Sequence, residues 1–253
     1  IFNNNSTSQV PQFKNVLTID KGKTLTFHTG QRCAIAGSLK GEGTYKIDFP
    51  YVRGDVSTNC SQFEGTYQVT TSNCRFTQAM DFSKATLQLD EGSYAAGFKA
   101  GKGDEATYTH KIGTLTGTGA LGSGTWLVTK VVSNATPLTI GGTLKLTKAT
   151  LDVTALCKKK LSDNAELKLF NLSAKAAITG ELTILPDSPK DGWEWDTSTL
   201  ATDGILRIKE LPDAIEAVNA EESAKVVYDL SGRRVSNPAH GIYIINGQKT
   251  VVK

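Results

Sequence analysis

The residues with the clearest chemical potential in this chain are Asp48, Arg53 and Asp55, which stand close together in the sequence. The planar guanidinium group of an arginine pairs well with a carboxylate, so Arg53 is suited to neutralise the acidic group of a uronic acid. A lyase that cleaves acidic polysaccharide uses such a basic residue together with calcium held by aspartates. It also needs carboxylates on neighbouring strands, and the sequence has no regular ladder of aspartates. We therefore assign no catalytic residue.

Other catalytic and metal-binding motifs are missing. The sequence has no nucleophile elbow, phosphate loop, zinc-protease motif or dinucleotide fingerprint. The sequence has three histidines, His28, His110 and His240. None is followed or preceded by a nucleophile or carboxylate at a spacing typical of a catalytic motif, so we expect structural or exposed roles for them. No Cys-x-x-Cys pair is present, which argues against a zinc site. We expect neither a metal nor a cofactor.

The four cysteines are Cys33, Cys60, Cys74 and Cys157. Cys60 and Cys74 flank one segment and are the first candidates for a disulfide, which an exported protein would permit. Buried free thiols are the alternative, and the sequence does not decide between the two.

Aromatic side chains offer a second kind of chemistry, the stacking of sugar rings. Trp193 and Trp195 are two positions apart, so on a strand they share one face. We take them, with Tyr51 and Arg53, as the candidate ligand-binding residues. The competing interpretation, which we favour for the tryptophans, is that they cover the open end of a sheet.

Composition excludes several classes of protein. The net charge is +3, the basic residues are scattered, and the single basic run lies at residues 158–160, so nothing indicates a nucleic-acid partner. No apolar stretch approaches the ~20 residues that span a bilayer. The chain begins as if in the middle of a protein, so we expect it to be a piece of a longer polypeptide.

The body of the chain, up to residue 210, is predicted to be a stack of short strands. Runs of alternating apolar and polar residues recur, as in TLTF at 24–27, TYKIDF at 44–49 and TLKL at 143–146. This alternation places one face in a core and the other in water. The pattern G-[ST]-L-x-G-x-G occurs at 37–43 and again at 113–119, and glycines there permit tight corners. Repeated strand-and-corner units favour a parallel β-helix, with an antiparallel sandwich or jelly roll as the alternative.

The body also resembles the autotransporter-associated β-strand repeat regions of large secreted Bacteroidetes proteins. The stretches GEGTY at 41–45, FPYVRGD at 49–55, SQFEGTY at 61–67 and GTG with GTW between 117 and 126 carry this resemblance. It implies a right-handed parallel β-helix, which in such proteins often follows a surface enzyme.

Residues 211–253 form a second region. Leu211-Pro212 breaks the pattern of the body, and an acidic linker follows. Turn signals at Ser231-Gly232, Asn237-Pro238 and Asn246-Gly247 then separate short β-prone runs, which predicts a small antiparallel domain.

This second region resembles the type-A C-terminal sorting domain of the type IX secretion system. The matching stretches are YDLSGRRV at 228–235, GIYIING at 241–247 and a basic end. The resemblance implies an address read by the outer-membrane secretion machinery and a location outside a bacterial cell or on its surface. Its expected signal residues are Tyr228, Asp229, Gly232, Gly241, Ile242, Tyr243, Gly247 and Lys253.

Together these features predict an exported, non-catalytic module that acts as a stalk, a spacer or a glycan-contacting region. Polysaccharide is the candidate ligand. The alternative is a β-helical carbohydrate-active enzyme, such as a lyase of acidic plant polysaccharide. Arg53 in a cleft with Asp48 and Asp55 would favour the enzyme.

Overall fold

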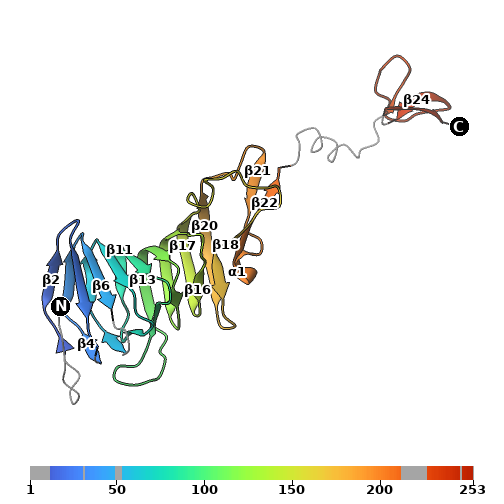
Figure 1. Ribbon diagram of the computed structural model, residues 1–253. Helices are drawn as coiled ribbons and strands as arrows, with labels where there is room; N and C mark the ends of the chain where they lie inside the picture. The colour runs from blue at the N-terminus through green and yellow to red at the C-terminus, as the bar shows by residue number, and fades with distance from the viewer. Residues whose placement is uncertain (1–11, 31, 49–52, 212–226, 246, 253) are drawn as a thin grey trace. The chain divides into compact units, whose positions relative to one another are not determined.

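The computed structural model describes residues 12–30, 32–48, 53–211, 227–245 and 247–252. Within them the protein is nearly all β-structure, and the one helix is the short α1 (Leu200–Asp203). The chain divides into two compact units, a body that ends at Lys209 and a tail unit that begins at Glu210. Figure 1 shows the strands of the body stacked in chain order.

Three parallel sheets make up most of the body. The first contains, in order, β1 (Gln12–Phe13), β4 (Cys33–Ile35), β7 (Gly54–Val56), β10 (Cys74–Phe76), β12 (Tyr94–Gly97), β14 (Ala120–Leu121), β16 (Leu138–Ile140) and β19 (Phe170–Leu172). The second contains β3 (Thr24–His28), β6 (Thr44–Asp48), β9 (Thr66–Val69), β11 (Asp81–Leu89), β13 (Thr109–Gly117), β15 (Thr125–Val132), β17 (Thr143–Asp152) and β20 (Ala177–Leu185). The third contains β2 (Val16–Ile19), β5 (Ser38–Gly41) and β8 (Asn59–Phe63).

The chain visits these sheets in a fixed rotation. It passes from β2 to β3 to β4, then from β5 to β6 to β7, and each strand pairs in parallel with its counterpart on the next visit. The later pairs in the two long sheets are parallel as well. An antiparallel sandwich pairs its strands the other way, so that alternative does not describe the body.

The rotation changes at β11. This strand pairs with β9 and also contacts β8 of the third sheet. Its register against β13 shifts between Phe82 and Thr86, and β17 carries similar irregularities against both of its neighbours. The single long strand β11 thus continues from both β8 of the third sheet and β9 of the second sheet. It can do so because a bulge bends a strand without ending it.

The core lies between the sheets and is filled by large side chains. Tyr45, Tyr67, Leu87 and Leu115 stand next to one another in register, and all are fully buried. The residues before them face outward and form a row of threonines: Thr44, Thr66, Thr86 and Thr114. The alternation predicted from the sequence is therefore confirmed along this row.

Glycines permit the corners where the chain leaves one sheet for the next. Gly41 has a φ of +91°, and a Cβ placed there would lie 2.3 Å from the backbone oxygen of Ile19. Gly117 has a φ of +112°, and its Cβ would lie 1.9 Å from the oxygen of Leu89. These two positions share a place in the repeated glycine pattern, and neither conformation nor space admits a side chain.

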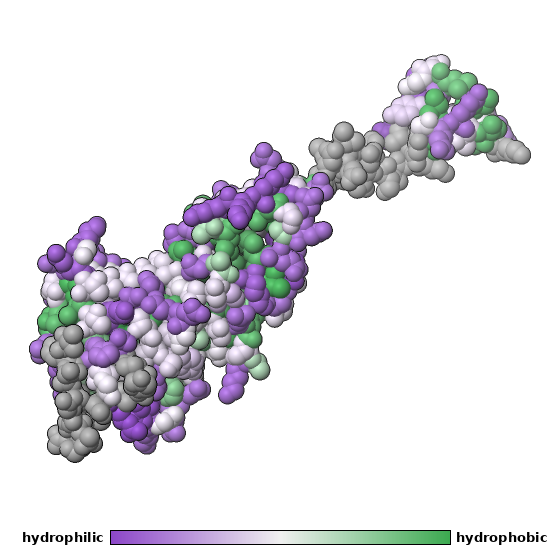
Figure 2. Space-filling model, viewed as in Figure 1, coloured by the Kyte–Doolittle hydropathy of each residue, from purple (hydrophilic) through white to green (hydrophobic). Residues whose placement is uncertain are grey.

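A small sheet lies at the end of the body. It contains β18 (Glu166–Lys168), β22 (Ile205–Glu210) and β21 (Trp193–Asp196), and β18 pairs with β22 in antiparallel fashion. Next to it, α1 and β20 line an apolar groove with Ile178, Leu182 and Leu200. Figure 2 shows hydrophobic residues reaching the surface over this end of the body.

The tail unit is a three-stranded antiparallel sheet. It contains β23 (Val227–Tyr228), β24 (Gly241–Ile245) and β25 (Gln248–Val252), with Ile242 opposite Val251. Asp229 shapes the loop after β23, because its carboxylate accepts hydrogen bonds from the backbone N–H groups of Ser231 and Arg233 at 2.8 and 2.9 Å.

Candidate functional site

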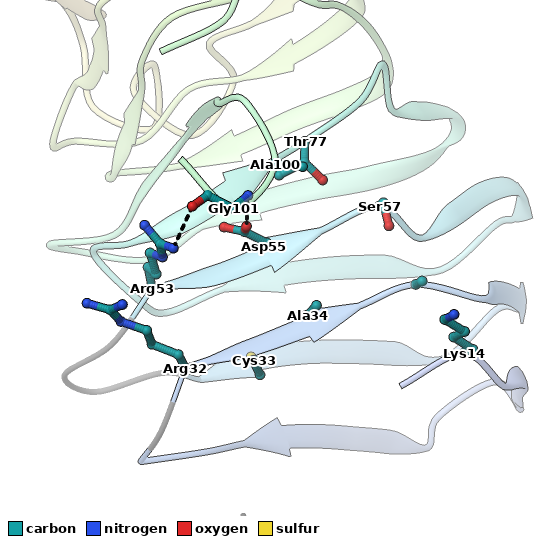
Figure 3. Close-up of a pocket in the computed structure, with 11 residues that line it drawn as sticks. Lys14, Arg32, Cys33, Ala34, Arg53, Asp55, Ser57, Thr77, Ala100 and Gly101 are labelled. Atoms are coloured by element: carbon teal, nitrogen blue, oxygen red, sulfur yellow. Dashed lines mark hydrogen bonds between the residues drawn. The ribbon is translucent and has the colours of Figure 1, made fainter. Parts of the chain in front are cut away.

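A basic pocket of about 370 Å³ lies against β4 and β7 of the first sheet (Figure 3). Its lining combines three cations, one carboxylate, two hydroxyl-bearing residues and several small residues. These are Lys14, Arg32, Arg53, Asp55, Ser57, Thr77, Cys33, Ala34, Ala36, Ala100 and Gly101. The volume falls in the ~300–1,000 Å³ range of small-molecule sites, at its lower end.

Backbone register brings two of the cations together. Arg32 directly precedes Cys33, Arg53 directly precedes Gly54, and Cys33 pairs with Gly54 across β4 and β7. Neighbouring strands are about 4.8 Å apart, so the two arginines start from adjacent positions at one edge of the pocket. Figure 3 shows their side chains at the same end of the pocket, with Lys14 at the other end.

The loop between β12 (Tyr94–Gly97) and β13 closes one side of the pocket. Arg53 donates a hydrogen bond from Nη2 to the backbone oxygen of Gly101 at 3.1 Å. The N–H of Gly101 donates in turn to Oδ2 of Asp55 at 2.8 Å. Gly101 has a φ of +68°, which suits a glycine at the turn of this loop. One glycine therefore contacts both Asp55 on β7 and Arg53, the residue just before this strand.

Arg75 on β10 (Cys74–Phe76) lies beside Asp55 on the same face of the sheet. Asp55 and Arg75 are in register on adjacent strands, and Nε of Arg75 lies 3.3 Å from Oδ1 of Asp55. The guanidinium group also lies over the ring of Phe98, 4.3 Å from its centre, and Arg75 is only 3% exposed. Burial lowers the pKa of Arg75. The carboxylate of Asp55 acts in the opposite direction, the charges of Arg53 and Arg32 lower the pKa further, and the net shift is downward. Among the described residues, Arg75 is thus the guanidinium group that pairs with Asp55.

The pocket has an excess of positive charge. Among the described residues, Arg32 and Lys14 have no carboxylate partner, and the carboxylate of Asp55 already contacts Arg75 and Gly101. An anion entering the pocket would meet two arginines with unused hydrogen-bond donors. The arrangement is suited to binding a small anionic group.

Of the three residues grouped by sequence, the structure brings only two together. Arg53 and Asp55 line the pocket, but Asp48 does not. Asp48 instead lies at the end of β6, where its Oδ2 is 2.9 Å from Nδ1 of His28 and its Oδ1 accepts from Thr70 at 3.4 Å. Tyr51 lies outside the described residues.

The two tryptophans occupy the end of the body rather than the pocket. The ring of Trp195 packs against the core, and its Nε1 donates to the backbone oxygen of Pro186 at 2.7 Å. The ammonium group of Lys190 lies 3.8 Å from the ring centre of Trp193. Both rings are partly buried, an arrangement that fits the covering role favoured for them.

Cysteine chemistry is suppressed at the pocket. All four cysteines are free thiols in the structure, including Cys60 and Cys74. Burial, with a contribution from Asp55, raises the pKa of Cys33 to about 12. The Cys33 thiol, which belongs to the buried core, is therefore protonated and a poor nucleophile. In the part of the chain that the structure describes, no three His, Cys, Asp or Glu side chains gather in a way that could hold a metal.

Sequence reasoning missed Arg32, Lys14 and Arg75. The signal for two of them was present, because Arg32, Arg53 and Arg75 recur at nearly the spacing of one turn through the three sheets. Aligning the strand runs by that spacing would have placed these arginines on neighbouring strands.

The tail unit places four of the eight expected sorting residues on strands of one small sheet and three in its loops and turns. Tyr228 ends β23, Gly241, Ile242 and Tyr243 begin β24, and Gly232 and Gly247 occupy turns with φ of +79° and +76°. Lys253 lies outside the described residues. Asp229 contacts Arg233 through a 3.0 Å ion pair in addition to its backbone contacts.

Comparison with known proteins gives no relative. No protein-family model matches the chain, and neither a curated protein nor a solved structure is significantly similar to it. Across the described residues, no helix has the length and apolar character needed to cross a membrane.

Proposed function

We propose that this chain is an exported, non-catalytic surface module whose body is a parallel β-helix that contacts glycans. Support for the β-helix comes from the passage of the chain through three parallel sheets in its first turns, and between the two long parallel sheets afterwards, around one apolar core. Such a stack of strands is rigid, which suits a spacer. It also holds outward-facing side chains at regular spacings, which suits the binding of a repeating polymer.

The observation that carries the glycan-contacting role is the basic pocket. It is concave, and it combines cations with hydroxyl groups and small side chains. These groups can bind a ligand, but the described lining residues provide no nucleophile paired with a base. Binding without turnover is the function that this geometry supports best.

We further propose that the tail unit is the export address, read by the outer-membrane type IX secretion machinery and leaving the body outside the bacterial cell or on its surface. The order of the motifs at 228–235 and 241–247 supports this, as does the compact antiparallel sheet that they form. Polysaccharide outside the cell is the expected ligand, and no nucleic-acid partner is proposed.

A lyase is the second candidate, because Arg53 and Asp55 do share a pocket. The position of Asp48 beside His28 weighs against it, since a calcium site would need further carboxylates near Arg53.

One experiment separates these candidates. The full chain is run in native gels cast with a panel of acidic and neutral polysaccharides, and the same mixtures are assayed for chain cleavage. We expect retardation by at least one polysaccharide without cleavage. Release of shortened chains would overturn the non-catalytic proposal in favour of the lyase. Absence of both effects would leave only a spacer.

A further inference from the structure

The positions of the cations in the basic pocket favour glycans that carry several negative charges. Arg32 and Arg53 lie at one end and Lys14 at the other, so the positive charge is divided between two places rather than concentrated in one (Figure 3). A polymer with an anionic group on successive sugars carries negative charges at intervals. Two separate cationic places in the pocket can contact two of these charges, whereas an isolated small anion can contact only one place.

The paired arginines favour a planar anion. A guanidinium group presents its N–H donors in a flat fork that matches the two oxygens of a carboxylate. Arg32 and Arg53 start from paired strands, and one Nη2 of Arg53 is already held by Gly101, which fixes its direction. Within the part of the chain that the structure describes, no hydrogen bond or ion pair engages Arg32.

Asp55 limits how much negative charge the pocket accepts. Its carboxylate is fixed by Gly101 and Arg75 and cannot turn away, so it repels part of any incoming anion. A group carrying one negative charge meets this repulsion less than a phosphate, which carries more charge near neutral pH. The pocket therefore favours a singly charged group.

The remaining lining fits a sugar ring. Ala34, Ala36 and Ala100 present small apolar side chains, which suit the C–H face of a pyranose. Ser57 and Thr77 add hydroxyl groups that can exchange hydrogen bonds with sugar hydroxyls. A pocket with a few polar groups in a mostly apolar wall is the usual form of a small-ligand site.

From these contacts we infer that the pocket binds the carboxylate of a hexuronic acid within an acidic polysaccharide, with Arg32 and Arg53 holding the carboxylate and Lys14 receiving that of a neighbouring sugar. This inference rests on the glycan-contacting role proposed above and names its ligand class.

The test uses affinity electrophoresis of the full 253-residue chain in three matched gels. The first contains polygalacturonate, the second the same polymer with its carboxylates methyl-esterified, and the third a sulfated galactan that has no carboxylate. We expect strong retardation in the first gel, none in the second and weaker retardation in the third. Equal retardation by the sulfated galactan would overturn the preference for a carboxylate.

Variants locate the site. Arg32→Gln and Arg53→Gln should each weaken polygalacturonate binding by about tenfold, because each removes charged hydrogen bonds to the ligand. Arg53→Lys should recover only part of the loss, since it restores charge without the fork. The matched control is Lys145→Gln, which removes one exposed charge from β17 outside the pocket and should leave binding unchanged.

Arg32→Gln is the decisive variant, because Arg32 has no described contact that the fold depends on. Its thermal midpoint should equal that of the unmodified chain. If Arg32→Gln and Arg53→Gln both bind as tightly as Lys145→Gln, the pocket is not the site, although glycan contact elsewhere would survive. If no polysaccharide retards the unmodified chain, the glycan-contacting role fails as well.

Discussion

Single residues determine the charge of the pocket. Arg75 is nearly excluded from solvent and needs a counter-charge, which Asp55 provides from the adjacent strand. Because Asp55 is engaged in this way, it does not neutralise Arg53 and Arg32. The ion pair between Asp55 and Arg75, on the same face of the sheet as the pocket, thus leaves Arg53 and Arg32 without a carboxylate of their own among the described residues.

His110 has the most strongly altered chemistry of the described histidines. It is fully buried, its ring stacks on Trp126 with 4.2 Å between ring centres, and its Nδ1 accepts a hydrogen bond from the N–H of Met80 at 3.2 Å. Burial lowers its pKa to about 4. The neutral imidazole is therefore part of the core, in agreement with the structural role expected from sequence.

This burial predicts an acid-sensitive fold. Between pH 6.5 and pH 4 the unfolded chain binds a proton at His110 and the folded chain does not, so stability falls as pH falls through that window. The full effect is about 3 kcal/mol, from a shift of roughly 2.5 pKa units. Denaturant unfolding followed by circular dichroism at a series of pH values measures it.

The control for this prediction is His110→Gln, which keeps an acceptor for Met80 but does not titrate. Its stability should depend less on pH over the window than that of the unmodified chain. His240→Gln, an exposed change in the tail unit, should leave the pH dependence of the body intact. A His110→Gln variant with the original pH dependence would contradict the assignment.

At the scale of elements, the sequence predicted the strands of the body better than it predicted the site. Alternation identified β6, β9 and β17, because one buried face imposes a period of two on the side chains. Of the long strand β11, alternation predicted only residues 86–89, because its register shift against β13 and its contact with β8 depend on pairing between distant parts of the chain. Arg32 was missed for the same reason, since pairing between distant residues places it beside Arg53.

The glycine corners are the element on which the stacking depends most directly. At Gly117 an alanine faces both a positive φ of +112° and a Cβ only 1.9 Å from the Leu89 oxygen. The backbone of β11 would have to move, so Gly117→Ala should destabilise the body by roughly 3 kcal/mol or more. Thermal or denaturant unfolding measures this loss.

Gly22→Ala is the matched control. Gly22 also has a positive φ, +75°, but a Cβ there meets nothing within 4 Å. Its cost should be limited to the backbone conformation, about 1–2 kcal/mol. Equal losses for the two variants would show that close approach between neighbouring turns contributes little at Gly117.

On the scale of the whole molecule, the filled core restricts where function can lie. Trp126, Tyr45, Tyr67 and Phe76 occupy the space between the sheets and are fully buried, and several of their rings contact one another. The interior therefore has no room for a ligand in this stretch. A site must be built on the outer faces and on the loops that cross them, as the basic pocket is.

The division into two units predicts that the tail can be removed without harm to the body. The last turn of the body is covered by its own residues, since Trp195 packs on the core and Arg207 on β22 pairs with Glu166 and Asp203 at 2.8 and 2.7 Å. Deleting residues 220–253 removes none of these contacts. The thermal midpoint of the truncated chain should match that of the full chain, as measured by circular dichroism.

The same deletion tests the proposed address when the chain, fused to an inner-membrane export signal, is expressed in a Bacteroidetes host with a working type IX system. The full chain should reach the cell surface or the medium, whereas the truncated chain should stay in the periplasm while remaining folded. Lys159→Gln, an exposed change in the body, serves as the control and should be exported normally. Surface delivery of the truncated chain would overturn the sorting proposal. A truncated chain that unfolds at lower temperature would instead show that the tail stabilises the body, and its retention could then not be attributed to a lost address.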